Sequence, residues 1–327
     1  MGILISGSIN LGLDIKCFIS WIDKSISIWY NGHMYKDLKT PLRYPGGKSR
    51  AVQFLFSAEN MPTREIKEYR EMFLGGGSCA LYFSMMRPHI PVWVNDKYYN
   101  LYCFWKQLQK DGKKLADKLH GVKTELSEAE DSLQAHLDYY HVMREGLNTA
   151  EDPFEIAWMF YVMNRCSFSG LGESTGSFSK DAVKDLFNHR LIDKLPKFSH
   201  IMRNWRITNE DYSHLLGDGA DENTFIFADP PYDINSFIYG NHGDMHDSFC
   251  HKRFHDQIDS TDSMVMVTYN SNETLRDAYT GWDQLEWDLT YTMHSGQKYR
   301  EDEHNRKELL LRNYESQGAS TLEDFFG

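Results

Sequence analysis

The sequence predicts an α/β protein built on a doubly wound mixed sheet, and three observations support this. Short apolar segments typical of buried strands alternate with helical segments along the chain. One such segment leads into a glycine-rich turn, a helix and a second strand that ends at Asn95-Asp96. Near the C-terminus, residues 285–293 and 308–314 have the pattern of an antiparallel pair.

The first half of the sheet is expected within residues 41–110. Residues 71–73 form a predicted short buried strand, and the turn Gly75-Gly76-Gly77-Ser78 leads into a helix from about residue 79 to residue 86. Residues 92–94 form the next strand. A strand, a glycine turn, a helix and a second strand in this order make up half of a Rossmann-like doubly wound sheet.

The middle of the chain has a different character. Residues 100–164 are predicted to be mostly helical, because Leu, Tyr and Phe recur at spacings of three and four between charged residues. Residues 166–196 are rich in Ser, Gly and Phe and are predicted to be irregular. Strands resume at residues 224–228 and 263–268.

The chain of 327 residues is long enough for one large domain and a smaller second unit. The sheet domain is expected to be discontinuous, with a helical unit inserted into it. The predicted division is an N-terminal extension at 1–40, the sheet domain at 41–110 and 207–316, the helical unit at 111–206, and a C-terminal tail at 317–327.

The net charge of −12 argues against a protein coated in basic charge. The charge is unevenly distributed, because residues 161–206 hold eight Lys/Arg against four Asp/Glu and so carry a net charge of +4. A local basic face of this kind suits a polyanion. The five cysteines form no CxxC pair, which argues against a zinc site or a disulfide framework and fits a reducing cytoplasm. We expect neither a signal peptide nor a membrane-spanning segment.

The glycine turn suggests a nucleotide-like ligand. Gly75, Gly77 and Ala80 fit the pattern G-x-G-x-x-A, and Asp96 follows about 20 residues later. Glycine lets the backbone approach a ligand closely, and the acid can hold ribose hydroxyls. Dinucleotides and S-adenosylmethionine both bind at such turns, and a plain strand-to-helix turn can look the same.

The most specific motif is Asp229-Pro230-Pro231-Tyr232, which follows an apolar strand. The Asp229 carboxylate and the Pro230 carbonyl can both accept hydrogen bonds from one exocyclic amino group, while Tyr232 offers a flat face for stacking. Two acceptors favour the pyramidal nitrogen whose lone pair attacks a methyl group. The alternative is an ordinary turn at a strand end.

The ordered set of motifs resembles the Dam-type, α-group adenine-N6-specific DNA methyltransferases of bacteria and phages. The similarity runs from about residue 41 to residue 314 and rests on R-Y-P-G-G-K at 43–48, F-L-G-G-G-S at 73–78, N-D at 95–96, N-R-x-x-F-S-G at 164–170, D-P-P-Y at 229–232, H-x-x-F at 246–249 and R-K-E-L-L at 306–310. The resemblance implies a class I methyltransferase sheet with a smaller, mainly helical DNA-recognition domain. It also implies S-adenosylmethionine as methyl donor and, as substrate, adenine flipped out of double-stranded DNA.

The resemblance assigns roles to residues at the matching positions. Catalysis falls to Asp229, Pro230, Pro231 and Tyr232. Cofactor binding falls to Tyr44, Gly47, Lys48, Phe73, Gly75, Gly77, Asp96 and Asp229. Contact with DNA falls to Arg43, Asn164, Arg165, Phe168 and Glu173, with Phe168 as a candidate wedge for base flipping.

Glu173 departs from the family pattern. Members specific for GATC have an arginine at this position, which contacts a guanine. A carboxylate cannot donate to guanine but can accept from cytosine N4. We therefore predict a recognition sequence other than GATC.

Three rival functions remain open. A nicotinamide oxidoreductase would explain Gly75, Gly77 and Asp96 but not the motif at 229–232. A second rival methylates another amine, such as cytosine N4, adenine in RNA or a protein amide. A third is a DNA-binding module without catalysis.

Other partners are not indicated by the sequence. We expect no membrane and no obligate protein partner, and whether a restriction endonuclease acts alongside the enzyme stays open. His242, His246, His251 and His255 cluster after the catalytic motif. We expect no metal there, because methyl transfer to an amine does not need one.

Overall fold

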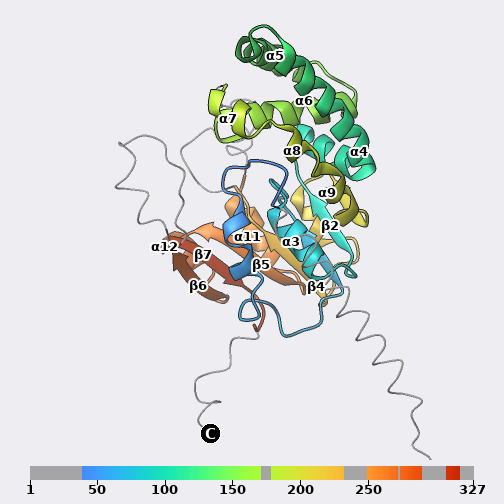
Figure 1. Ribbon diagram of the computed structural model, residues 1–327. Coiled ribbons are helices and arrows are strands. Elements are labelled where there is room, and N and C mark those ends of the chain that lie inside the picture. Colours follow the sequence, from blue (N-terminus) through green and yellow to red (C-terminus); the bar gives the residue numbers. More distant parts are fainter. Residues whose placement is uncertain (1–38, 171–177, 232–248, 272, 289–306, 317–327) are drawn as a thin grey trace, which may run out of the picture.

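The computed structural model describes residues 39–170, 178–231, 249–271, 273–288 and 307–316. Within these ranges, seven strands form one sheet in the order β3-β2-β1-β4-β5-β7-β6 (Figure 1). The strands are β1 (Glu68–Glu71), β2 (Val92–Asn95), β3 (Trp205–Thr208), β4 (Thr224–Ala228), β5 (Met264–Asn270), β6 (Asp283–Asp288) and β7 (Lys307–Arg312). Strands β1 to β5 are parallel to one another, whereas β7 runs antiparallel to both β5 and β6.

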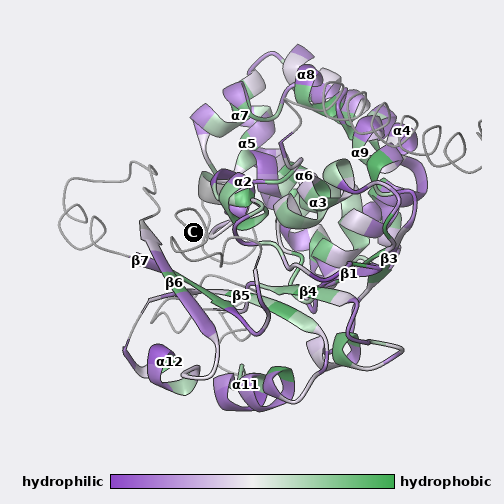
Figure 2. Ribbon diagram, turned by 90° about the horizontal axis from the view of Figure 1, so that it is seen from below, coloured by the Kyte–Doolittle hydropathy of each residue, from purple (hydrophilic) through white to green (hydrophobic). Residues whose placement is uncertain are grey.

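Helices cover both faces of this sheet (Figure 2). Helices α2 (Val52–Leu55) and α3 (Ser78–Met86) lie on one face, and α11 (His251–Asp259) and α12 (Glu273–Ala278) lie on the other. Side chains alternate along β4, so Phe225 and Phe227 join one apolar cluster while Ile226 and Ala228 join the other. A central strand buried on both faces explains the continuous apolar run in its sequence. The expected Rossmann-like, doubly wound mixed sheet is confirmed.

A group of helices lies beside the sheet, at the top of Figure 1. It consists of α4 (Tyr99–Glu128), α5 (Ser132–Leu147), α6 (Pro153–Cys166), α7 (Lys180–Asp185), α8 (His189–Ile192) and α9 (Leu195–Ile201). Helix α6 is at its centre, with every residue from Ile156 to Cys166 buried. Three short 3₁₀ turns complete the elements: η1 (Lys48–Arg50), η2 (Phe168–Gly170) and η3 (Tyr212–Leu216).

The proposed domain boundaries fall at two recognisable places. The boundary at 110/111 coincides with a break in α4, where Asp111 has the non-helical angles φ −158° and ψ 81°. The boundary at 206/207 falls inside β3 and therefore cuts a strand of the sheet. The division into domains stays a prediction, and its second boundary is better drawn before Trp205.

Two sequence predictions were wrong in detail. The strand expected at 71–73 lies at Glu68–Glu71. It was misplaced because a charged residue such as Arg70 is not expected in a buried strand. Arg70 is buried and donates to the backbone oxygens of Leu215, Gly217 and Asp218, so its charge is well solvated by protein. Strand β3 was not predicted at all.

The segment 166–196 was predicted to be irregular, but it contains α7, α8 and the start of α9. Both short helices have side-chain caps, since Ser179 accepts from the Ala182 N–H and Asn188 accepts from the Leu191 N–H. The expected C-terminal antiparallel pair is confirmed as β6 and β7, although residues 289–293 of the predicted first strand lie outside the described residues. No helix in the described ranges is both long and apolar enough to cross a membrane.

Candidate active site

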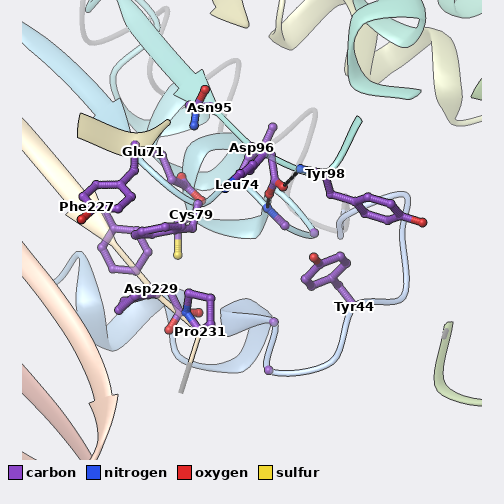
Figure 3. A pocket seen from close by; sticks show the side chains of 18 of the residues that line it. Tyr44, Glu71, Leu74, Cys79, Asn95, Asp96, Tyr98, Phe227, Asp229 and Pro231 are labelled. Carbon is purple, nitrogen blue, oxygen red and sulfur yellow. Dashed lines mark hydrogen bonds between the residues drawn. The ribbon is translucent and has the colours of Figure 1, made fainter. Parts of the chain in front are cut away.

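An open cavity lies at the carboxyl ends of the parallel strands. This is the edge of a doubly wound sheet where ligands bind. The loop at 44–48, the turn after β1, the ends of β2 and β4, and residues at 211–212 and 249–253 line it. Figure 3 shows Tyr44, Asp96 and Asp229 around the same space. The sequence-predicted cofactor and catalytic motifs therefore meet in one place.

Asp229 follows the last residue of β4, and its carboxylate is held from two sides. The Lys48 Nζ donates to Oδ2 at 2.8 Å, and the Thr268 Oγ1 donates to Oδ1 at 2.8 Å. Thr268 comes into reach because β4 and β5 are parallel neighbours with Ala228 opposite Val267.

The prolines of the catalytic motif, Pro230 and Pro231, both line the cavity. Tyr232 lies outside the described residues, so its stacking role stays a prediction. Lys48 is buried and also donates to the Gly46 carbonyl oxygen at 3.0 Å. Its ammonium group is thus fixed at the junction of the 44–48 loop and the catalytic strand.

The glycine turn is shaped by two aromatic side chains. Gly75 has φ 47°, and a Cβ there would lie 2.9 Å from the Tyr44 ring. On the other side, the Trp105 indole donates to the Gly75 carbonyl oxygen at 3.0 Å, and a Cβ on Gly77 would lie 2.6 Å from that indole. The lack of a side chain at these glycines therefore lets Tyr44 and Trp105 pack against the turn, and Gly75 also lines the cavity. Gly77, unlike Gly75, does not line the cavity.

Asp96 lies beside the turn at the end of β2. Its Oδ2 accepts from the Gly75 N–H at 2.8 Å, and its Oδ1 accepts from the Tyr98 N–H at 2.9 Å. Burial raises the pKa of Asp96 to about 7, although the bond from Gly75 works against that shift. The carboxylate faces the cavity, where it is an acceptor suited to a ribose diol (Figure 3).

Glu71 is a cavity residue that the sequence reasoning missed. It is the last residue of β1, is buried, and accepts a hydrogen bond from the Tyr69 hydroxyl at 2.7 Å. Burial raises the pKa of Glu71 well above its usual range, and the neighbouring Asp229 charge adds to this. The misplaced strand prediction hid the signal, because a carboxylate at a strand's carboxyl end is a site candidate.

An aromatic wall lines the cavity; it joins Phe73, which was predicted to bind the cofactor, to Tyr212 and Phe249, which were given no role. The Phe73, Tyr212 and Phe249 rings pack with centroids 5.4 to 5.6 Å apart. The Arg253 Nη2 donates to Asp211 at 2.9 Å and so ties α11 to the residue before Tyr212. Flat apolar surfaces of this kind suit a heteroaromatic ring.

The residues predicted to contact DNA do not share one environment. Phe168 is 50% exposed, as a wedge requires, whereas Asn164 and Arg165 are only 2% and 6% exposed. Arg43 is half-buried and donates to the Ser167 carbonyl oxygen at 2.7 Å. Burial lowers the pKa of Arg43, as does the nearby Arg165 charge. Direct contact with a duplex does not fit Asn164 or Arg165, and Glu173 lies outside the described residues.

Two of the four clustered histidines have other partners. The His251 Nδ1 lies 3.1 Å from the Tyr269 hydroxyl, and His255 lies beside Asp256. His242 and His246 fall outside the described ranges. Within those ranges, no group of three or more His, Cys, Asp and Glu side chains is arranged to hold a metal ion. The expectation of a metal-free site stays a prediction.

The chain matches a protein-family model. The model of the D12 class N6 adenine-specific DNA methyltransferases matches residues 44–293, which is more than half of the chain. This range includes the cavity-lining motifs from Tyr44 to Phe249.

Two curated proteins are similar to this chain. The type II methyltransferase M.MjaIII of Methanocaldococcus jannaschii is 22% identical over 209 residues, covering 60% of this chain and 70% of its own. The type II methyltransferase M.CviBI of Paramecium bursaria Chlorella virus NC1A is 22% identical over 181 residues, covering 50% and 63%. Among solved structures, the rRNA methyltransferase aviRa from Streptomyces viridochromogenes matches with a TM-score of 0.34 and 14% identity, over 86% of this chain and 89% of its own. The fold assignment rests on the strand order and not on that match.

Proposed function

This chain belongs to the D12 class of N6 adenine-specific DNA methyltransferases, and we propose that Asp229 is the group at which its target adenine is methylated. The enzyme transfers the methyl group of S-adenosylmethionine to N6 of adenine in DNA. One observation carries the assignment of the site. The Asp229 carboxylate opens into the same cavity as the glycine turn, Tyr44 and Asp96.

Asp229 acts on the amino group by accepting hydrogen bonds, not by covalent attack. Its carboxylate and the Pro230 carbonyl each accept from one N–H of the adenine amine. This draws the nitrogen lone pair out of conjugation and directs it toward the methyl group. S-adenosylmethionine, when bound, supplies that methyl group on a positively charged sulfur. Asp229 is also placed to accept the proton that the methylated nitrogen releases.

Lys48 and Thr268 position Asp229 for this task. Each donates to a different carboxylate oxygen, so the plane of the carboxylate is fixed before the substrate arrives. A preorganised acceptor needs no reorientation during the reaction. The buried ammonium group of Lys48 also compensates the negative charge of the partly exposed Asp229.

The residues around the glycine turn fit the cofactor. Asp96 offers an acceptor for the ribose hydroxyls, while Tyr44 and Phe73 flank the turn with aromatic surface. Gly47 and Lys48 complete the loop on the Asp229 side. The cofactor loop and turn and the catalytic Asp229-Pro230 line one continuous cavity, which supports binding of the cofactor beside the base.

Double-stranded DNA is the proposed partner, with the target adenine flipped out of the stack. Exposed Phe168 is suited to fill the space that the base leaves. We further propose a recognition sequence other than GATC because of Glu173. Both relatives are named type II methyltransferases, which favours methylation at one defined DNA sequence. Any restriction endonuclease would then be a separate protein. The bacterial or phage-infected cytoplasm is the proposed location.

The test is expression of the wild-type chain and of Asp229→Ala in cells that lack adenine methylation. Mass spectrometry of the nucleosides should show N6-methyladenine only with the wild type, and long-read sequencing should place it at one short sequence. Methylated cytosine, or unchanged methylation with Asp229→Ala, would overturn the proposed site. Methylation at GATC alone would overturn only the specificity.

A further inference from the structure

The loop that carries Tyr44 and Lys48 is tied to the end of α6 by the side chain of Asn164. Its Oδ1 accepts from the Arg43 N–H at 3.0 Å, and its Nδ2 donates to the Arg43 carbonyl oxygen at 2.7 Å. The same Nδ2 donates to the Gly170 carbonyl oxygen at 3.1 Å. The amide thus pairs with the Arg43 backbone as a neighbouring strand would.

Three further contacts hold the same two segments together. Arg43 donates to the Ser167 carbonyl oxygen, and Arg165 donates to the Pro41 carbonyl oxygen. Gly170 has φ 79°, and a Cβ there would lie 2.3 Å from the Arg43 carbonyl oxygen. The loop and the end of α6 are therefore in direct backbone contact, and only glycine fits at this point.

The other end of the loop is fixed in the active site. The Tyr44 ring packs on the glycine turn, where a Cβ on Gly76 would lie 2.8 Å from the Tyr44 Cβ. Thr40 donates to the Gly76 carbonyl oxygen, and Lys48 pairs with Asp229. One short loop consequently touches the cofactor turn, the catalytic carboxylate and the segment from Asn164 to Gly170, which includes exposed Phe168.

We propose that Asn164 is a positioning residue that couples DNA binding to cofactor binding through the 40–48 loop. The inference rests on the proposed function, because it takes Phe168 to be on the DNA side and the turn to be on the cofactor side. A ligand that orders the loop from one side removes part of the ordering cost for the ligand on the other side. Each ligand then strengthens the binding of the other by the same factor.

The experiment measures this factor directly. Binding of radiolabelled S-adenosylhomocysteine, which cannot transfer a methyl group, is measured by equilibrium dialysis with and without unmethylated plasmid DNA. For the wild type we expect DNA to tighten binding by about fivefold or more, as in typical coupled sites. Asn164→Asp keeps the size and the acceptor but loses both donated bonds, and should bring the ratio near one.

Two more variants make the test decisive. Asn148→Asp makes the same charge change at the exposed end of α5 and should keep the wild-type ratio. Gly170→Ala pushes a methyl group into the Arg43 backbone and should lower the ratio as Asn164→Asp does. Thermal unfolding shows whether each variant is folded, and Gly170→Ala decides the question if Asn164→Asp is not.

The outcomes separate the two proposals. A wild type that binds no S-adenosylhomocysteine contradicts the proposed cofactor site. A wild type that binds it with a ratio near one overturns the coupling. So does an unchanged ratio in Asn164→Asp and Gly170→Ala, even if both ligands bind more weakly, because that is the result of a merely structural role.

Discussion

The end of β4 and the end of α6 both carry family motifs, yet the two regions use their polar side chains in opposite ways. At β4, the Asp229 side chain is 21% exposed and faces an open cavity. At α6, Asn164 and Arg165 are buried and donate to the backbone of the 41–43 segment. A strand end at the sheet edge presents its side chain to a ligand, whereas a helix buried on all sides has only protein to bind. A motif therefore locates a site more reliably than it assigns a role within it.

The largest predicted effect concerns Asp229, the partly exposed carboxylate at the end of β4. Asp229→Asn keeps the shape of the side chain but removes the charge that polarises the amine. We expect kcat to fall by on the order of 10²–10³-fold, as for loss of one preorganised electrostatic group. The affinity for S-adenosylmethionine should change little, as measured by equilibrium binding. Retention of more than about a tenth of kcat would contradict the catalytic role.

The same contrast applies within the DNA-facing segment, where Phe168 is exposed and Asn164 is not. Phe168→Ala should lower kcat/KM for DNA by roughly 10–100-fold, because flipping a base costs a few kcal/mol that the wedge offsets. Cofactor affinity should stay unchanged. A mispaired target adenine should restore much of the rate, since it is already unstacked.

The control for this variant is Val142→Ala, which removes an equally exposed apolar side chain from α5. It should leave kcat/KM for DNA at the wild-type value. An equal loss in both variants would indicate a general effect on the helical unit and not a wedge.

A smaller effect is expected at Thr268, which touches the substrate only through Asp229. Thr268→Val removes the hydroxyl at constant shape and should lower kcat by about tenfold, corresponding to one hydrogen bond of about 1.4 kcal/mol. Thr268→Ser should restore the rate. A change in KM for the cofactor with kcat unchanged would show that Thr268 does not act through the carboxylate.

The sequence predicted the regions that are regular and buried on both faces. Strand β4 was placed at its observed bounds, because T-F-I-F-A is uniformly apolar and ends at Asp229. Strand β3 was missed, because it is four residues long and includes an exposed Arg206. Because β3 was missed, Asp211 and Tyr212 could not be recognised as residues that follow a strand and line the cavity.

The roles of Asn164 and Arg165 were beyond sequence reasoning for a different reason. Their bonding partners lie more than 100 residues away in the chain, at Pro41 and Arg43. No local sequence pattern shows that a polar side chain will hydrogen-bond to the backbone of a residue far away in the chain. Glu71 was missed for another reason, since the strand predicted at 71–73 put it at the amino end, whereas the observed β1 puts it at the carboxyl end beside the cavity.

The smallest predicted effect concerns Asp96, and it follows from the sign of a pKa shift. Burial raises the pKa of this carboxyl to about 7, so it is protonated in much of the free enzyme at slightly acid pH. Only the ionised form offers acceptors on both oxygens for ribose hydroxyls. Cofactor binding should therefore be strongest above about pH 7.5 and weaken as the pH falls, by about threefold down to about pH 6.5.

Asp96→Asn is the matched variant for this measurement, since it keeps the size of the side chain and does not titrate. It should bind the cofactor more weakly than the wild type at high pH, with an affinity that is flat across the same range in a titration at constant ionic strength. A wild-type affinity that is equally flat would mean that the Asp96 carboxylate serves only the N–H groups of Gly75 and Tyr98. Asp96 would then resemble Asn164, as a polar side chain that bonds to backbone groups of the protein and not to a ligand.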